Sequence, residues 1–121
     1  MVEVRALPGR ERVLIVYRGQ VLADELEEAA RQLREALPGL GPAFDVLTDI
    51  TTAEPLTPAA VEGVRRLAEL LVPAGLRTHV RVVGRSGQTA LQFQRVNRMV
   101  GYESRLAFSQ AEGEALLDGR A

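Results

Sequence analysis

The turn Gly84-Arg85-Ser86-Gly87 carries the residues of this 121-residue chain that are best suited to chemistry. It follows a valine-rich run and precedes a segment with helical spacing, so it predicts a strand-to-helix turn. Backbone N–H groups at such a helix start, with the guanidinium of Arg85 beside them, favour the binding of an anion. The turn also half-matches the nucleophile elbow of hydrolases, but Gln88 replaces the second glycine. The simpler interpretation is that Ser86 caps the helix, which requires no ligand.

A second set of polar side chains lies where the central apolar segment of the sequence ends. Asp49 falls at the carboxyl end of this predicted strand, where ligand sites of α/β proteins gather. Thr51, Thr52 and Thr57 add hydroxyl groups close by. Thr57 precedes Pro58, which is typical of an N-cap followed by proline at the first helical position. Asp49 thus either caps the following loop or contributes to a site, and Thr57 either caps a helix or accepts a phosphate that a helix N-terminus would stabilise.

The catalytic and metal-binding chemistry open to this chain is narrow. It has no cysteine and one histidine, His79, which excludes disulfides, thiolate catalysis and the common zinc-ligand sets. All 15 basic residues are arginine, so a Schiff-base lysine and a P-loop lysine are excluded as well. A lone histidine at a strand edge is typical of a surface residue or of a structural residue with satisfied hydrogen bonds. We therefore expect no catalytic residue, no metal site and no cofactor.

Charge and hydropathy narrow the classes of partner. The net charge is -1 and no basic block occurs, so the sequence does not favour nucleic acid as a partner. No segment approaches the roughly 20 apolar residues of a membrane span, and the N-terminus lacks the apolar run of a signal peptide. We expect a cytoplasmic protein with no membrane insertion, and the arginine-rich composition suggests a bacterial gene.

The order of strand and helix patterns predicts one α/β domain over residues 1–121. Two β-prone segments flank Pro8-Gly9 and indicate an N-terminal antiparallel hairpin. Because strands separated by helices favour right-handed crossovers, we expect a mostly parallel sheet of four to five strands with about four helices. The expected strands are 2–7, 12–18, 44–50, 79–83 and 105–108, and the expected helices are 22–37, 58–72, 88–100 and 109–118.

Several segments of the sequence resemble the STAS domain superfamily, and most closely its divergent SpoIIAA-like (STAS/SEC14-related) bacterial members. These segments extend over nearly the whole chain and include strands, turns and the C-terminal region. They are Val16-Tyr17-Arg18-Gly19 before an acidic helix, Phe44 to Asp49, Val80 to Ser86, Gly101-Tyr102, Arg105 to Phe108, and Glu112 to Leu117. The resemblance implies a STAS-like fold.

The resemblance also implies a place for a regulatory switch. Antagonists of this superfamily carry an Asp-Ser-Ser-Gly type motif at the start of the helix after the central strand, and a partner kinase phosphorylates its serine. This sequence has Thr57-Pro58-Ala59-Ala60 in that place, so Thr57 is the one candidate phosphoacceptor there.

Taken together, these observations predict a non-catalytic regulatory module, in bacterial signalling, that binds another protein or a second copy of itself. The docking edge would extend from Asp49 to Thr57 and include the neighbouring turn Gly84 to Gly87. The alternative is a small-ligand-binding domain of the SpoIIAA-like type that holds an anionic or apolar molecule at the same edge. An enzyme is the third reading, and it lacks the bases that catalysis would require.

Overall fold

A computed structural model describes residues 1–119 of the chain, and Arg120 and Ala121, which the expected domain 1–121 includes, lie outside the described residues. The strands are β1 Val2–Leu7, β2 Arg12–Gly19, β3 Phe44–Ala53, β4 Leu76–Val82 and β5 Arg105–Ala107. The helices are α1 Ala23–Ala36, α2 Pro58–Ala68, α3 Leu71–Ala74, α4 Gly87–Val100 and α5 Gln110–Leu117, and Pro8–Arg10 and Leu37–Leu40 form 3-10 turns. The α/β class and the N-terminal hairpin are confirmed.

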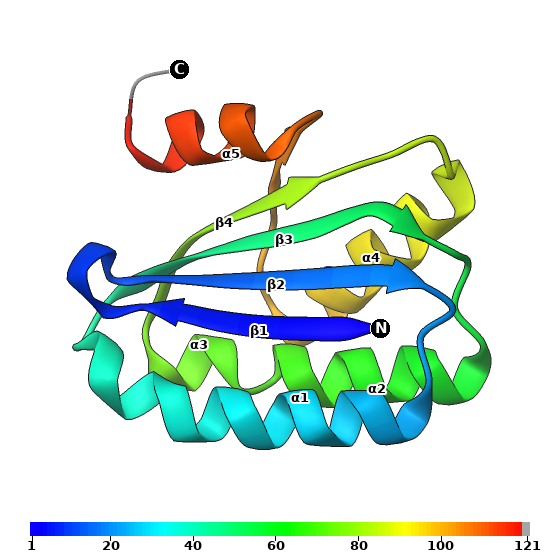
Figure 1. Cartoon of the computed structure of the whole chain (residues 1–121), viewed down its shortest axis with the longest axis horizontal. Coiled ribbons are helices and arrows are strands. Elements are labelled where there is room, and N and C mark those ends of the chain that lie inside the picture. The colour runs from blue at the N-terminus through cyan, green and yellow to red at the C-terminus, as the bar shows by residue number, and fades with distance from the viewer. Residues whose placement is uncertain (120–121) are drawn as a thin grey trace.

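The five strands form one sheet in the order β1-β2-β3-β4-β5, in which β1 pairs antiparallel with β2 and the remaining pairs are parallel. Because this order never reverses, right-handed crossovers place the connecting helices α1, α2 and α4 on the same face of the sheet. The last helix, α5, follows β5 and covers the opposite face (Figure 1). The sheet therefore separates a thick helical layer from a thin one.

The two faces carry hydrophobic clusters of unequal size. The larger cluster lies under α1, α2 and α4 and includes Phe44, Leu33 and Phe93. The smaller one lies under α5 and consists of Leu47, Val80, Val82 and Ala107. Both faces of β3 are covered by helices, which explains why residues 44–50 are all buried, including the polar Asp45, Thr48 and Asp49.

Two strands are longer than the sequence predicts. β3 continues past Ile50 because, after an irregularity, Thr52 pairs with Arg18 and Ala53 with Gly19 of β2. Thr51 and Thr52, which the sequence places in a loop, therefore belong to a strand. β4 begins at Leu76 because this residue pairs with Phe44, far away in the sequence.

The single helix predicted over 58–72 is two helices, and Pro73, the next residue, does not end the second of them. α2 ends at Ala68, and α3 starts at Leu71 with Pro73 inside it. Proline is tolerated there because the first residues of a helix donate no intrahelical hydrogen bond. Gly75, with a φ of 116°, ends α3 instead.

A buried arginine holds α5 onto the sheet. Arg12 of β2, only 3% exposed, donates to the carboxylates of Glu114 and Asp118, and the distance from Nη2 to Asp118 Oδ1 is 2.7 Å.

Within residues 1–119, none of the helices has both the length and the hydropathy of a membrane span.

Candidate functional site

The two predicted loops lie side by side at the carboxyl edge of the sheet, on the right in Figure 1. The closest approach is between Gly84, after β4, and Thr51 near the end of β3. A methyl group at Gly84 would overlap the carbonyl oxygen of Thr51, so no larger residue fits without a shift of the backbone. The fold thus joins the aspartate-threonine segment to the glycine-arginine-serine turn.

Asp49 is a buried structural residue of this edge and not an exposed charge. Its Oδ1 accepts from the backbone N–H of Thr51 at 2.9 Å and from the Thr51 hydroxyl at 2.7 Å. Its Oδ2 accepts from Nε2 of Gln110 on α5 at 2.6 Å. With 6% of its surface exposed, Asp49 bonds to Thr51 within β3 and joins β3 to α5. It positions Thr51.

The helix starts beside this edge are capped as the sequence predicts. Thr57 Oγ1 accepts from the backbone N–H of Ala60 at 3.2 Å, and Ser86 Oγ accepts from that of Thr89 at 3.1 Å. Thr57 is exposed although its hydroxyl caps α2. Thr51, Thr52, Gly84, Arg85 and Gly87 are exposed as well, whereas Ser86 is half-buried.

This edge is a surface and not a cleft. Ligand crevices of open α/β sheets form where the strand order reverses, and this sheet has no such point. Of the eight predicted site residues, only Gly87 lines one of five well-formed hollows among residues 1–119. The same residues hold no group of three His, Cys, Asp or Glu side chains suited to a metal ion. The edge is therefore a surface formed by two adjoining segments.

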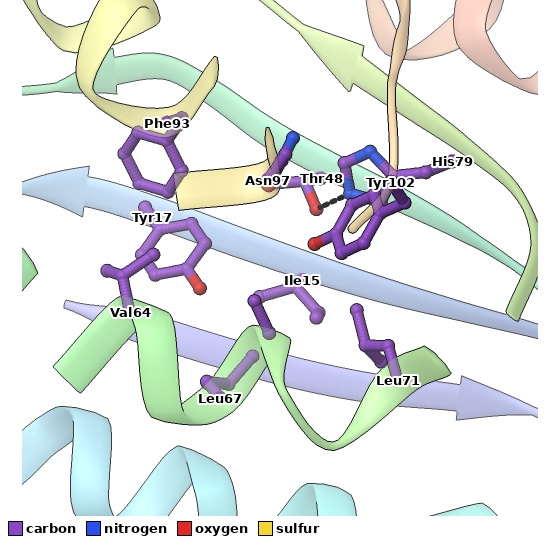
Figure 2. A pocket seen from close by; sticks show the side chains of 11 residues that line it. Ile15, Tyr17, Thr48, Val64, Leu67, Leu71, His79, Phe93, Asn97 and Tyr102 are labelled. Carbon is purple, nitrogen blue, oxygen red and sulfur yellow. Dashed lines mark hydrogen bonds between the residues drawn. The ribbon is translucent and has the colours of Figure 1, made fainter. Parts of the chain in front are cut away.

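A buried polar cluster inside the larger layer was not predicted from the sequence (Figure 2). His79 lies between two hydroxyl groups, with Nε2 at 2.8 Å from Thr48 Oγ1 and Nδ1 at 2.6 Å from Ser104 Oγ. With its amide oxygen facing donors, Asn97 accepts from Ser104 Oγ at 2.7 Å and from Arg81 Nη1 at 2.8 Å. The residue types alone give little sign of this cluster, because its members come from distant parts of the chain.

The direction of these hydrogen bonds determines the tautomer of His79. Because Ser104 donates its proton to Asn97, its oxygen accepts from His79, so the ring proton is on Nδ1 and the Thr48 hydroxyl donates to Nε2. Burial, together with the positive charge of Arg81, lowers the pKa of His79 from 6.5 to about 3. His79 is therefore neutral and structural, the second of the two readings that the sequence left open.

The cluster borders an interior cavity of about 10 Å³, which is at the lower limit for one water molecule. Figure 2 shows the phenol groups of Tyr17 and Tyr102 turned toward this space between the sheet and α2. Burial raises the pKa of both phenols above its ordinary value, so both stay protonated. The cavity is too small to bind a ligand.

Two solved structures match this chain over almost its full length. One is the anti-sigma factor antagonist SpoIIAA in its unphosphorylated form, with a TM-score of 0.68 and 16% identity, covering 98% of this chain and 99% of the other. The other is a Shewanella loihica PV-4 protein of the DUF3478 family with a SpoIIAA-like fold. Its TM-score is 0.71 at 14% identity, and the match covers 97% of this chain and 92% of that protein's chain. The chain has the SpoIIAA-like fold. No protein-family model matches the sequence, nor does any curated protein.

The resemblance to the STAS superfamily that the sequence suggests is thus confirmed at the level of the fold. The SpoIIAA-like fold includes a regulatory protein, the anti-sigma factor antagonist. Identities of 14–16% are too low to transfer individual site residues, so the roles of Thr57 and the Gly84–Gly87 turn depend on the geometry described above.

One residue of interest that sequence reasoning missed is Arg81. It interrupts the valine run Val80 to Val83, and a charged residue inside an apolar strand was the available signal. Its side chain is 4% exposed and points to the face that α4 covers. Unlike Arg12, it has no carboxylate partner among the ion pairs of residues 1–119.

Proposed function

We propose that this protein is a non-catalytic regulatory module that binds another protein through the carboxyl edge of its sheet. We call this surface the docking edge and define it as Thr51, Thr52, Thr57 and the turn Gly84–Gly87, with Asp49 behind it. The observation that carries the proposal is that the close approach of Gly84 to Thr51 joins the two segments, and local hydrogen bonds fix Thr51, Thr57 and Ser86, although most of these residues are exposed. A preorganised exposed surface loses little conformational entropy when a partner binds.

The shape of the docking edge supports a protein partner over a small molecule. Small-molecule sites are concave, typically about 300–1,000 Å³, and enclose most of the ligand. The docking edge offers exposed hydroxyls, the exposed guanidinium side chain of Arg85 and turn backbone, and of its residues only Gly87 borders a described hollow. Such groups suit hydrogen bonding across a protein interface.

The fold gives independent support of a coarser kind. The anti-sigma factor antagonist that shares it acts, by its description, on another regulatory protein. A bacterial signalling role for this chain is part of the proposal, as is the expectation that catalysis plays no part in it.

Thr57 is the residue of the docking edge that we propose as a phosphoacceptor. Its hydroxyl is at the N-terminus of α2, an 11-residue helix, and the residue is exposed to a kinase. A phosphate at this position would lie at the N-terminus of α2, where the helix dipole favours negative charge. Phosphorylation would then change the charge of the docking edge without unfolding α2.

The experiment that tests the proposal is affinity purification from the native host, followed by mass spectrometry of the bound proteins and of this chain. Three baits are compared: the wild type, Arg85→Glu, and Arg34→Glu as a matched control. Arg34 is exposed near the C-terminal end of α1, at the opposite end of the molecule from the docking edge (Figure 1).

We expect the wild type and Arg34→Glu to retain the same protein in stoichiometric amount and Arg85→Glu to lose it. Equal retention by all three baits would place the interface elsewhere, and no retained protein would refute the docking function. Phosphate on Thr57 would identify a switch, and Thr57→Asp, which keeps a good N-cap, should then change retention. A partner without phosphate on Thr57 would refute the phosphoacceptor role alone.

A further inference from the structure

A groove separates α4 from the edge strand β5 on the face of the sheet that bears the larger cluster. Its volume is about 330 Å³, and its walls are mostly apolar side chains, among them Val83, Ala90, Leu91 and Leu106. Arg81 and Gln94 contribute polar groups to it. A smaller hollow of about 70 Å³ shares Arg81, Gln94 and Leu106 and continues toward Tyr102.

The charge of Arg81 is not compensated within the part of the chain that the structure describes. No ion pair there includes Arg81, and its Nε is enclosed without a hydrogen-bond partner. Its one hydrogen bond to a side chain is to the neutral amide of Asn97. The carboxylate of Glu103 is nearby but pairs with Arg98 at 3.2 Å.

The contrast with Arg12 shows that this arrangement is unusual for the molecule. Both arginines are on strands and both are at least nine-tenths buried, at 3% and 4% exposure. Among residues 1–119, Arg12 forms ion pairs with two carboxylates, and Arg81 forms none. A buried charge without a counter-ion is costly, and burial lowers the pKa of Arg81 accordingly. An arginine in this state is suited to an anion supplied from outside the chain.

We propose that the groove between α4 and β5 binds a small carboxylate with an apolar tail, whose carboxylate pairs with Arg81. A guanidinium matches a carboxylate through two parallel N–H···O bonds. The larger groove contains one guanidinium and no second cation, so it fits a monoanion. Its volume is in the range of small-molecule sites. The tail would cover Leu91 and Leu106, which are 44% and 51% exposed.

Leu106 controls access to Arg81. It is the direct neighbour of Arg81 in the β4–β5 register and lies on the same face of the sheet. Because Arg81 is almost enclosed, we expect the side chain of Leu106 to change rotamer when the carboxylate enters, which exposed side chains do rapidly. This site is distinct from the docking edge, with Gly87 as the one residue common to both.

The probes are octanoate and octanamide, which differ in charge but share the apolar tail. Binding is followed by amide chemical-shift changes in two-dimensional NMR. We expect saturable shifts at β5 and α4, with octanoate bound at least roughly tenfold more tightly than octanamide because only the carboxylate pairs with the guanidinium. Equal affinities, or no saturable shift in the groove, would overturn the proposal.

Substitutions separate a site at Arg81 from nonspecific binding of an amphiphile. Arg81→Met removes the charge and should abolish the preference for octanoate. Its melting temperature should equal or exceed that of the wild type, because replacing an uncompensated buried charge by an apolar side chain is often neutral or stabilising. Arg85→Met, on the exposed turn nearby, should leave the preference unchanged. An undiminished preference in Arg81→Met would refute the site.

A second pair of variants keeps the proposal testable if Arg81→Met does not fold. Leu106→Glu places a carboxylate next to Arg81 and should act as a tethered ligand, because register neighbours on one face of a sheet are within side-chain reach. We expect it to abolish octanoate binding and to melt at a higher temperature than Leu106→Gln. Octanoate binding that is equal in the two variants would overturn the assignment of Arg81 as the anion partner.

Discussion

Lowering the pH from about 7 to 5 should destabilise this protein through His79. The native state holds the ring neutral, with its pKa lowered to about 3, whereas the unfolded chain returns it to an ordinary 6.5. Between these two values the unfolded state binds a proton that the native state does not, so stability falls as the pH falls. The limiting slope is about 1.4 kcal/mol per pH unit.

The loss expected between about pH 7 and pH 5 is about 2 kcal/mol, below two pH units of the limiting slope, because the unfolded ring is only partly protonated near pH 7. That is a large share of the roughly 5–15 kcal/mol by which native domains are stable. The structure explains why the native ring resists protonation: the ring is buried, Arg81 is close on the same face, and both ring nitrogens already have hydroxyl partners. A second ring proton would require the Thr48 hydroxyl to accept where it now donates.

The assay is urea denaturation at several pH values in this range, with His79→Gln as the control. Glutamine removes the one titrating imidazole of the chain and leaves every carboxylate in place. We expect the wild type to lose about 2 kcal/mol more than His79→Gln over the same interval. A difference below about 0.5 kcal/mol, or an NMR titration of the ring near its ordinary pKa, would refute the reasoning.

Two further predictions concern stability. Gly84→Ala should destabilise the protein by about 2 kcal/mol or more in denaturant melts, because the new methyl group meets the Thr51 carbonyl. Gly87→Ala, at the open start of α4, should be neutral or stabilising by up to about 1 kcal/mol in the same assay. Equal effects of the two substitutions would argue against the close approach of the two segments. Arg12→Met should lower the free energy of unfolding by about 2–4 kcal/mol, because it removes both ion pairs that Arg12 of β2 forms with Glu114 and Asp118. Arg10→Met is the control: the Arg10 side chain is 64% exposed, and its loss should lower the same free energy by at most about 0.5 kcal/mol. An equally small effect of Arg12→Met would mean that α5 is held by its apolar contacts.

Local signals in the sequence predict local structure well in this chain. Thr57, Ser86 and Ser109 all cap helices, since a cap bond joins residues only three positions apart. Ser109 and Glu112 have the spacing of a capping box, which is only partly formed. Ser109 accepts from the Glu112 N–H, but the Glu112 carboxylate accepts from the backbone N–H of Phe108 and not from that of Ser109. The fold class follows from the same local patterns taken in order.

Boundaries that depend on distant partners could not be predicted in this way. The last residues of β3 form strand because Arg18 and Gly19 of β2 continue the ladder beside them. The first residue of β4 is strand because Phe44 pairs with Leu76. No local sequence pattern predicts either extension, because backbone pairing across a sheet depends on the register between strands and not on the residues of one strand.

The sequence by itself determined the alternation of strands and helices, the caps, and the absence of thiol and lysine chemistry, because these depend on residue type and short spacing. The tertiary structure alone decided which polar residues are satisfied. Arg12 and Arg81 are alike in the sequence, each an arginine on a strand, yet α5 brings two carboxylates to the first and no helix brings one to the second. The sequence contains the charges, but only the packing of distant elements determines which of them find a partner.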